Sequence, residues 1–455
     1  MGKDLRNRAS HVPAANQKRP ALLRSAFLFL LMLGTSSFAE DIAVSVARDG
    51  DRLIQIFKDL HQNPELPFQE VETAALIARE LRANGFEVHE GIGETGVVGI
   101  LLNGDGPVVM VRADMDGLPI REETDLPYKS TAIKTDADGK QVPTMHACGH
   151  DAHVTWLIGV AKQLADRRDD WKGTVVLVGQ PAEELITGAV AMVEDGLYDV
   201  APQPDVIIAA HNYPFYPARS VAIGNGRRMA GTDQIDVIIH GVGGHGSTPN
   251  AAKDPVIMGA MATLGYQAVV SRVVDQYQPS VLTVGAFQAG DTNNIIPDSA
   301  TLKLNLRWYR EIERDALISG IRSVTDNIAR MYNMPADGMP EYIMKGYATP
   351  VINAPEDHER AKAAMVVALG PDRVLEGIPP LMGSEDFQML ASPFDDVKVV
   401  LIEVGGGEAD AYTNLMEQGR LPAFVNHNSR FEVDLQAVPS GTIALTAVAL
   451  EYLDD

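Results

Sequence analysis

The sequence predicts an α/β protein built from two structural units, and three observations support this prediction. The chain has 455 residues, of which 45% are hydrophobic and 22% charged, values typical of a soluble globular protein longer than one ordinary domain. Short apolar runs alternate with longer helical stretches, as in a sheet covered by helices on both faces. Residues 229–334 change to the order strand, helix, strand, strand, helix, which indicates a small inserted sandwich of sheet and helices.

The elements of the first unit follow from the spacing of apolar side chains. From residue 41 to residue 82 this spacing has the helical period, interrupted by the loop HQNPELPF at residues 61–68. Another helix is expected from about His153 to Arg167. The clearest strands are GVVGILL (96–102), PVVMVRADMD (107–116), GTVVLVGQ (173–180) and PDVIIAAH (204–211). Polar motifs follow such strands, and this is where open α/β sheets bind their ligands.

The first 39 residues have the three parts of a secretory signal. Basic residues precede an apolar run from Ser25 to Gly34, and small residues end the segment at Ala39. The run is too short to cross a bilayer, so we expect cleavage after Ala39 and export to the periplasm or the exterior, with retention as an anchor as the alternative. The net charge of −23 repels nucleic acid and anionic membranes, so neither is an expected partner.

The only cysteine of the chain, Cys148, lies in the segment MHACGHDAH at residues 145–153. Cys148 and His150 are two positions apart, a spacing that lets both side chains of a tight loop converge on one ion. A thiolate and an imidazole together suit zinc and similar metals. A buried structural cysteine beside surface histidines is the alternative, and this stretch alone does not decide between the two.

An acidic pair follows the strand predicted at residues 173–180. Glu183 and Glu184 are neighbours in the segment QPAEEL, and adjacent side chains of an extended chain point to opposite sides. One carboxylate could bind a metal ion while the other faces the water that the metal activates, as a metal hydrolase requires. The alternative is a solvated acidic pair at the start of a helix, where negative charge is favourable.

Polar side chains mark further strand ends. His211 closes DVIIAAHN, His427 lies in FVNHNSRF, and Asp114 and Asp116 lie in VRADMDGLP. Because side chains alternate along a strand, both aspartates lie on one face and could orient histidine ligands. Core or rim histidines and loop-capping aspartates are the alternatives. Together, these coincidences at strand ends favour a metal site.

These motifs resemble those of the M20 metallopeptidase family, most closely its amidohydrolase branch of hippurate hydrolases, N-acyl-amino-acid amidohydrolases and auxin-conjugate hydrolases. They run in family order through nearly all of the chain beyond the signal segment. The matching segments are HQNPEL (61–66), RADMDGLP (112–119), MHACGHDAH (145–153), QPAEE (180–184), GGHGSTP (243–249), NIIP (294–297), MGSEDF (382–387) and NHN (426–428). One departure is that Leu185 and Ile186 follow Glu184 where many relatives have glycines, which puts the substrate specificity in question.

The resemblance implies an α/β fold: a metallopeptidase-type catalytic domain with a mixed sheet flanked by helices, and an inserted ferredoxin-like α+β lid that also forms dimers. We expect a signal peptide at residues 1–39. The catalytic domain would then comprise residues 40–228 and 335–455, and the lid or dimerisation domain residues 229–334. A homodimer or higher homo-oligomer through the lid is the expected assembly.

The resemblance also assigns roles to the motif residues. Two divalent metal ions, Zn²⁺ or Mn²⁺ with Co²⁺ as a further candidate, would have the ligands Cys148, His150, Glu184, His211 and His427. Cys148 would take the bridging position. Glu183 would be the general base, and Asp116 would support a ligand histidine.

Three residues of the lid complete the implied site. His245 would reach the active site of the partner subunit and stabilise the oxyanion, with a turn histidine between glycines as the alternative. Asn294 and Arg307 would hold the substrate carboxylate. A surface arginine at the end of a strand is the alternative for Arg307.

The activity implied is hydrolysis of the amide bond of N-acyl amino acids with an aromatic acyl or acetyl group. Water activated by the metals would attack the carbonyl, with a glutamate as the general base. An exported dipeptidase of the same family is the first alternative. A non-catalytic periplasmic binding protein on the same fold is the second, and the loss of a ligand residue would have favoured it; none is lost here.

Overall fold

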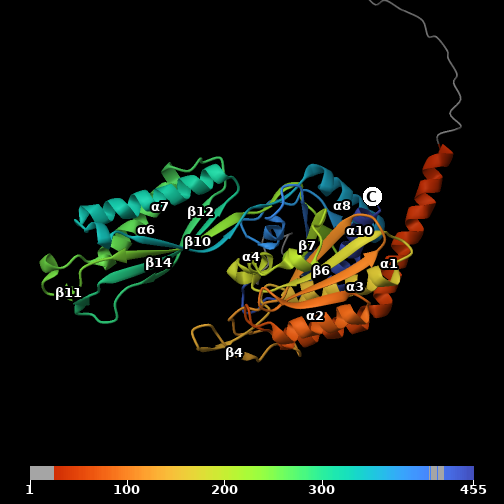
Figure 1. Ribbon diagram of the computed structural model, residues 1–455, viewed down its shortest axis with the longest axis horizontal. Helices are drawn as coiled ribbons and strands as arrows, with labels where there is room; N and C mark the ends of the chain where they lie inside the picture. The colour runs from red at the N-terminus through yellow and green to blue at the C-terminus, as the bar shows by residue number, and fades with distance from the viewer. Residues whose placement is uncertain (1–24, 409, 411–413, 415–417, 419–424, 455) are drawn as a thin grey trace, which may run out of the picture.

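The computed structural model describes residues 25–408, 410, 414, 418 and 425–454, so most of the predicted signal segment lies outside the described residues. Figure 1 shows a large body and a smaller one, joined by extended strands. The large body contains an eight-stranded sheet and the small body a four-stranded sheet. Within this described part of the chain, no helix combines the length and apolar character needed to cross a membrane.

The large sheet is mixed, and its central strands are parallel. The strand order is β1 (Glu87–Ile92), β2 (Gly96–Asn103), β6 (Gly173–Gln180), β3 (Val108–Asp114), β7 (Val206–Pro217), β18 (Lys398–Gly407), β8 (Val221–Ala222) and β17 (Val374–Leu375). Strands β6, β3, β7 and β18 are parallel to their neighbours in this group. Their carboxyl ends therefore meet at one edge of the sheet. The four strands predicted from the sequence correspond to β2, β3, β6 and β7.

Helices cover both faces of the large sheet, which confirms the predicted fold class. One core contains Val109 and Val111 of β3 together with residues of five helices, and the other contains Met110 of the same strand. The helices of the first core are α1 (Ser25–Gln62), α2 (Val71–Ala83), α3 (His150–Asp166), α8 (Pro355–Leu369) and α10 (Ala437–Leu453). The second core receives α4 (Gly188–Glu194), α5 (Leu197–Val200) and the 3₁₀ turn η5 (Phe387–Ala391). Because neighbouring side chains of a strand point into different cores, nearly every residue of the strand is apolar.

Two helices begin earlier than the sequence predicts. Helix α1 begins at Ser25, not at residue 41, and runs through the predicted cleavage position after Ala39. Helix α3 begins at His150 because Gly149 precedes it with a left-handed φ of 90°. A Cβ atom on Gly149 would lie 3.2 Å from Asn212 Cβ, so glycine also permits a close approach to β7. This start places His150 in the first turn of α3.

The small body has the β-α-β-β-α-β order of a ferredoxin-like sandwich. Its elements are β10 (Gly231–His240), α6 (Pro255–Arg272), β12 (Val281–Gln288), β14 (Ser299–Trp308), α7 (Glu311–Met331) and β15 (Glu341–Ala348), and its antiparallel sheet has the order β12-β14-β10-β15. The sheet thus extends beyond the boundary expected at residue 334. Strand β15 is an edge strand in which only two of eight residues are buried, so its sequence lacks a clear apolar alternation.

Short strand pairs lie at the two ends of the small body. At the junction with the large body, β9 (Gly226–Met229) pairs with β16 (Val351–Asn353). There the buried Arg228 donates hydrogen bonds to Glu403 of β18, which ties the junction to the large sheet. At the opposite end of the small body, β11 (Gly244–His245) pairs with β13 (Ile295–Ile296) (Figure 1). A hairpin of β4 (Ile133–Thr135) and β5 (Gln141–Pro143) completes the large body.

A buried charged network fixes the first turn of α3 against α1. His61, near the end of α1, donates through Nδ1 to Asp151 of α3 at 2.7 Å and contacts Glu122 through Nε2 at 3.2 Å. Burial disfavours the charged imidazole, but the hydrogen bonds with the two carboxylates outweigh it and raise the pKa of His61 to about 10. The imidazolium and the carboxylates therefore stabilise one another beside His150.

We expect the contribution of His61 to stability to depend on pH. Because its pKa rises from an ordinary 6.5 to about 10 on folding, the contribution is complete below pH 6.5 and is lost as the pH rises through about 10. The difference in unfolding free energy between the wild type and His61→Gln should shrink over this range, by up to about 1.4 kcal/mol per pH unit. Urea unfolding of both proteins at pH 6.5, 8 and 9.5 measures this difference in unfolding free energy. His89→Gln, which changes a partly exposed histidine of β1, is the control, and a His61→Gln difference that is independent of pH would contradict the charged network.

Candidate metal centre

The structure brings the five predicted ligands together at the carboxyl edge of the parallel strands. Cys148 and His150 come from the start of α3, Glu184 from the 3₁₀ turn η1 (Glu183–Leu185) after β6, His211 from β7, and His427 from the segment after β18. Two overlapping groups form, Cys148 with His150 and His211, and Cys148 with Glu184 and His427. Within each group the ligand atoms lie within 4.8 Å of one another. Since Cys148 belongs to both groups, its sulfur lies between two potential metal positions.

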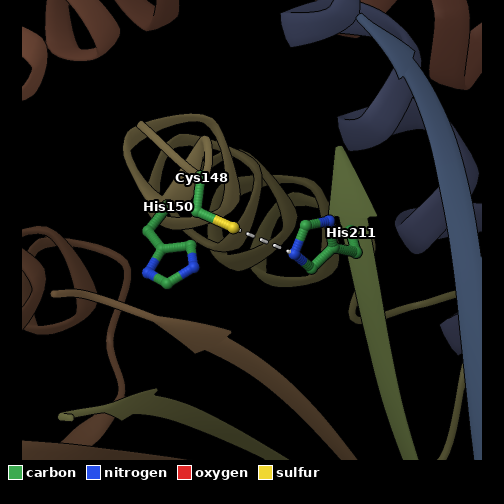
Figure 2. A group of neighbouring side chains, drawn as sticks. All are labelled: Cys148, His150 and His211. Atoms are coloured by element: carbon green, nitrogen blue, oxygen red, sulfur yellow. Dashed lines mark hydrogen bonds between the residues drawn. The ribbon is translucent and has the colours of Figure 1, made fainter. Parts of the chain in front are cut away.

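The hydrogen bonds of His211 prepare its Nε2 atom for a metal ion. Figure 2 shows the Cys148 sulfur pointing toward this atom, at 3.6 Å, with the ring of His150 on the other side of Cys148. Nδ1 of His211 donates to the carbonyl oxygen of Asn212 at 2.9 Å, so Nε2 is free to act as a ligand. Burial lowers the pKa of His211 and keeps the ring neutral, as metal coordination requires.

Unpartnered polar atoms indicate that the site fits a cation. His150 Nε2 and Glu184 Oε1 are buried and have no hydrogen-bond partner among the described residues. These two atoms lie 4.0 Å apart, and Glu184 Oε1 is 3.3 Å from His427 Nε2. Buried polar atoms are rarely left without partners. A divalent ion held by a thiolate, imidazoles and a carboxylate would satisfy them, and this donor set suits zinc and neighbouring transition metals.

The electrostatics of the site favour positive charge. Burial disfavours the charged form of His150, but Asp114 and Asp116 outweigh burial and raise its pKa. The neighbouring Cys148 and the carboxylate of Glu184 raise the pKa of His427 as well. The negative groups that hold protons on these rings would equally stabilise a metal ion, so metal binding should release protons.

Asp116 connects both glutamates to a predicted ligand histidine. Its Oδ1 accepts the backbone N–H of Glu183 at 3.1 Å, and its Oδ2 accepts that of Glu184 at 3.0 Å. Oδ1 also lies 3.3 Å from Nδ1 of His150. One carboxylate therefore sets the positions of three residues of the site.

Glu183 lies in a buried acidic cluster that Arg112 partly neutralises. Carboxylate oxygens of Glu183, Glu385 and Asp386 lie within 4.8 Å of one another. Arg112 of β3 donates to Glu385, Asp386 and Asp114. Burial and the charge of Glu385 raise the pKa of Glu183, and a raised pKa suits a carboxylate that must take up a proton near neutral pH.

Of the other two histidines of the MHACGHDAH segment, His153 lies with Asp114 and His150 in a further group whose potential ligand atoms are within 4.8 Å of one another. His153 donates through Nδ1 to Asp114 at 2.6 Å and accepts the N–H of Asn212 through Nε2 at 2.9 Å, so both of its nitrogens are occupied. His146 is buried, and burial lowers its pKa to about 4. Spacing along the sequence could not distinguish these two rings from that of His150.

Left-handed backbone conformations border the site. Ala182, Ile186 and His427 have φ angles of 51°, 57° and 68°. Ala182 and Ile186 flank the turn that carries Glu183 and Glu184, and the N–H of His427 donates to Ala147 O at 2.7 Å. Non-glycine residues in this region cost of order 1–3 kcal/mol each, and they persist where surrounding contacts determine them.

The structure separates the three predicted residues of the small body. Arg307 of β14 is partly buried, and its pKa is lowered by burial while the charges of Glu183 and Glu184 oppose this shift, so the guanidinium lies within electrostatic reach of the two glutamates. His245 of β11 and Asn294, whose carbonyl accepts the N–H of Gly246, lie together at the far end of the small body (Figure 1). Within one chain, His245 and Asn294 are therefore remote from Glu183.

Sequence motifs located the candidate ligands and the supporting Asp116, but they did not show how the other residues around the site are connected. Arg112 and Glu385 stood in recognised motifs, RADMDGLP and MGSEDF, yet only the fold shows that they pair. Glu70 had no signal beyond its position after HQNPELPF, and its carboxylate contacts the backbone just before Glu183.

Comparisons with known proteins identify the family of the chain. A family model described as Peptidase family M20/M25/M40 matches residues 110–422. Hippurate hydrolase of Campylobacter jejuni is 39% identical over 335 residues, which cover 73% of this chain and 83% of the relative. N-acetylcysteine deacetylase of Bacillus subtilis is 39% identical over 288 residues, 63% of this chain and 73% of the relative. An IAA-amino acid hydrolase of Arabidopsis thaliana is 31% identical over 405 residues, 89% of this chain and 86% of the relative.

Solved structures have the same architecture. A structure described as a putative aminohydrolase from methicillin-resistant Staphylococcus aureus superposes with a TM-score of 0.76 at 27% identity, covering 91% of this chain and 99% of that chain. A Bacillus subtilis protein described as a dinuclear metal binding peptidase from the M20 family superposes with a TM-score of 0.68 at 28% identity, covering 90% and 99%.

Proposed function

The chain belongs to peptidase family M20/M25/M40, and from this premise we propose that it is a metal-dependent amidohydrolase that cleaves the amide bond of N-acyl amino acids. The observation that carries the proposal is the pair of ligand groups that share Cys148 beside the buried Glu183. The preference for aromatic acyl or acetyl groups is supported by two relatives that are named for hippurate and for N-acetylcysteine.

Two divalent metal ions are the proposed cofactors. Their ligands are Cys148, His150, Glu184, His211 and His427, and Cys148 is the shared one. Zn²⁺ suits the thiolate and imidazoles, while the carboxylate also accepts Mn²⁺ or Co²⁺. When bound, such ions lower the pKa of a water molecule and polarise the substrate carbonyl.

The protein moves protons through Glu183 and binds the substrate carboxylate through Arg307. Glu183 takes a proton from the attacking water and delivers it to the leaving nitrogen. Asp116 holds the backbone of Glu183, so the carboxylate does not have to be oriented at the moment of reaction. Arg307 of β14 interacts electrostatically with the two glutamates, and its fixed charge can hold the carboxylate of the amino acid.

His245 and Asn294 act on the site of a partner subunit in this proposal. The N–H of Ser247 donates to Nδ1 of His245 at 3.1 Å, which leaves the proton on Nε2 and makes that atom a donor for the oxyanion. A homodimer through the small body is favoured by the exposed apolar side chains Ile257, Met261 and Leu264, which recur at helical spacing along α6.

Export to the periplasm or the exterior remains part of the proposal. It is supported by the basic, apolar and small residues of the first 39 positions and by the single cysteine, which the proposed metals would protect from oxidation. Mass spectrometry of the secreted protein locates its N-terminus, and a mature chain beginning at Glu40 is the expected result.

The first test is amino-acid release from a substrate panel. Benzoyl-, acetyl- and indoleacetyl-amino acids are compared with free dipeptides, with added Zn²⁺ or Mn²⁺ and a chelator control. We expect cleavage of the acyl amino acids, loss of activity with the chelator and recovery on adding metal. Cleavage of dipeptides alone would favour an exported dipeptidase, and no cleavage with any metal would favour a binding protein.

The two glutamates should have different effects when each is replaced by glutamine. Glu183→Gln removes the base, so kcat should fall by about 10²–10⁴-fold while the metal content measured by elemental analysis stays that of the wild type. Glu184→Gln removes a ligand and should lower the metal content itself. If Glu183→Gln loses metal to the same degree as Glu184→Gln, the two roles are assigned wrongly.

Mixed subunits test whether His245 acts across a dimer. Glu183→Gln and His245→Ala should each be nearly inactive alone, because one lacks the base and the other the oxyanion donor. After unfolding and refolding together, a heterodimer contains one site with both intact residues, so activity should reappear. Mixing Glu183→Gln with a Glu183→Gln/His245→Ala double variant is the control. Failure of complementation while dimers form would contradict a role for His245 in trans.

A further inference from the structure

The turn that carries the two site glutamates is held by three successive backbone N–H groups. The N–H of Ala182 donates to Glu70 Oε1 at 2.9 Å, and those of Glu183 and Glu184 donate to the two oxygens of Asp116. Consecutive N–H groups around a left-handed residue form a concavity that binds anions. Here the left-handed residue is Ala182, and the anions are two buried side chains of the protein.

Glu70 does not cap α2, although its position in the chain suggests that role. It precedes α2 at the N-cap position, yet its side chain makes no cap hydrogen bond to that helix. Instead Glu65 accepts the N–H groups of Glu72 and Thr73 at 3.2 and 2.9 Å and so caps α2. The Glu70 carboxylate turns into the protein, where Thr95 donates to its second oxygen at 2.5 Å. Both oxygens are therefore committed to segments outside α2.

Burying the Glu70 carboxylate costs free energy, which argues that its burial serves a function. Glu70 is fully buried, and burial together with the nearby charge of Asp116 raises its pKa to about 7. A cap for α2 would not require such burial, since Glu65 already provides it. What the carboxylate secures is the N–H of Ala182, which would otherwise be a buried donor without a partner, next to Glu183.

We propose that Glu70 is a positioning residue for the metal centre: by holding Ala182 in the left-handed conformation, it fixes the direction in which Glu183 and Glu184 leave the sheet. The inference rests on the proposed function, because it assigns Glu183 and Glu184 their roles there. Thr95, in the turn between β1 and β2, fixes the second oxygen of Glu70 and so contributes to the same effect. The segment after HQNPELPF thus supports the turn between β6 and α4, 112 positions further along the chain.

The test compares two carboxylates of similar burial at the start of one helix. Glu70→Ala removes the partner of Ala182, whereas Glu65→Gln alters the true cap of α2 and leaves the site untouched. Co²⁺ binding is followed by the absorption of the Cys148 thiolate–Co²⁺ bond, and kcat and KM are measured on the best substrate of the panel. Thermal unfolding of each variant reports its effect on stability.

We expect Glu70→Ala to weaken Co²⁺ binding by about 10–100-fold and to lower kcat by a similar factor, with KM changed little, as for other residues that orient metal ligands. Glu70→Gln keeps a carbonyl oxygen that can accept the N–H of Ala182, so its Co²⁺ affinity and kcat should be close to those of the wild type. Glu65→Gln should lower the unfolding temperature while Co²⁺ affinity and kcat stay at the wild-type values.

Wild-type Co²⁺ affinity and kcat in folded Glu70→Ala would overturn the proposal and leave Glu70 with a structural role only. If Glu70→Ala does not fold, Thr95→Val decides, because it should weaken Co²⁺ binding in the same direction by a smaller factor, and an unchanged affinity would overturn the proposal. If the wild type cleaves no acyl amino acid, the proposed function fails, but the Co²⁺ titration still shows whether Glu70 positions Glu184.

Discussion

The metal centre depends on the place of Asp116 just beyond the end of β3. Strand β3 lies between β6 and β7, the strands that lead to the site glutamates and carry His211. From this central position one carboxylate accepts the N–H groups of both Glu183 and Glu184 and contacts His150 of α3. Asp116 therefore fixes the positions of residues from two other segments, the turn after β6 and the start of α3. Because Asp116 binds both backbone N–H groups, a shift of β3 relative to β6 would disturb Glu183 and Glu184 together.

Burying this many acidic groups requires positive charge close by, and the chain supplies it in two places. Arg112 neutralises the Glu385 and Asp386 side of the cluster. His61 does the same for Asp151, the residue that follows His150. Between them the carboxylate of Glu184 and the thiol of Cys148 lie close to histidine rings, those of His150, His211 and His427. A cation is the partner that would complete this arrangement, since breaking up a buried ionic network leaves uncompensated charge.

The central strands could be predicted from the sequence because they depend on local pattern, and the candidate ligands because their motifs resemble those of a family. Strands such as β6 are continuous apolar runs, and the polar residues that follow them are conspicuous. What could not be predicted depends on tertiary contacts. Strand β15 is identified only by its pairing with β10, since its exposed residues lack an apolar alternation. His153 differs from His150 only through partners on β3 and β7. Glu70 looks like an ordinary helix cap until Glu65 is seen to take that role.

The geometry of the small body restricts how its residues can act on one substrate. Strand β14 runs for ten residues from Ser299 to Trp308, about 30 Å at the rise of an extended chain. Arg307 is at the end near the metal centre, while the strand begins just after β13, which pairs with the β11 segment containing His245. An acyl amino acid is far shorter than this strand. His245 and Arg307 of one chain therefore cannot hold the same molecule in this arrangement, so His245 takes part in the reaction only if a second copy presents it. In a monomer it would be no more than a turn residue between glycines.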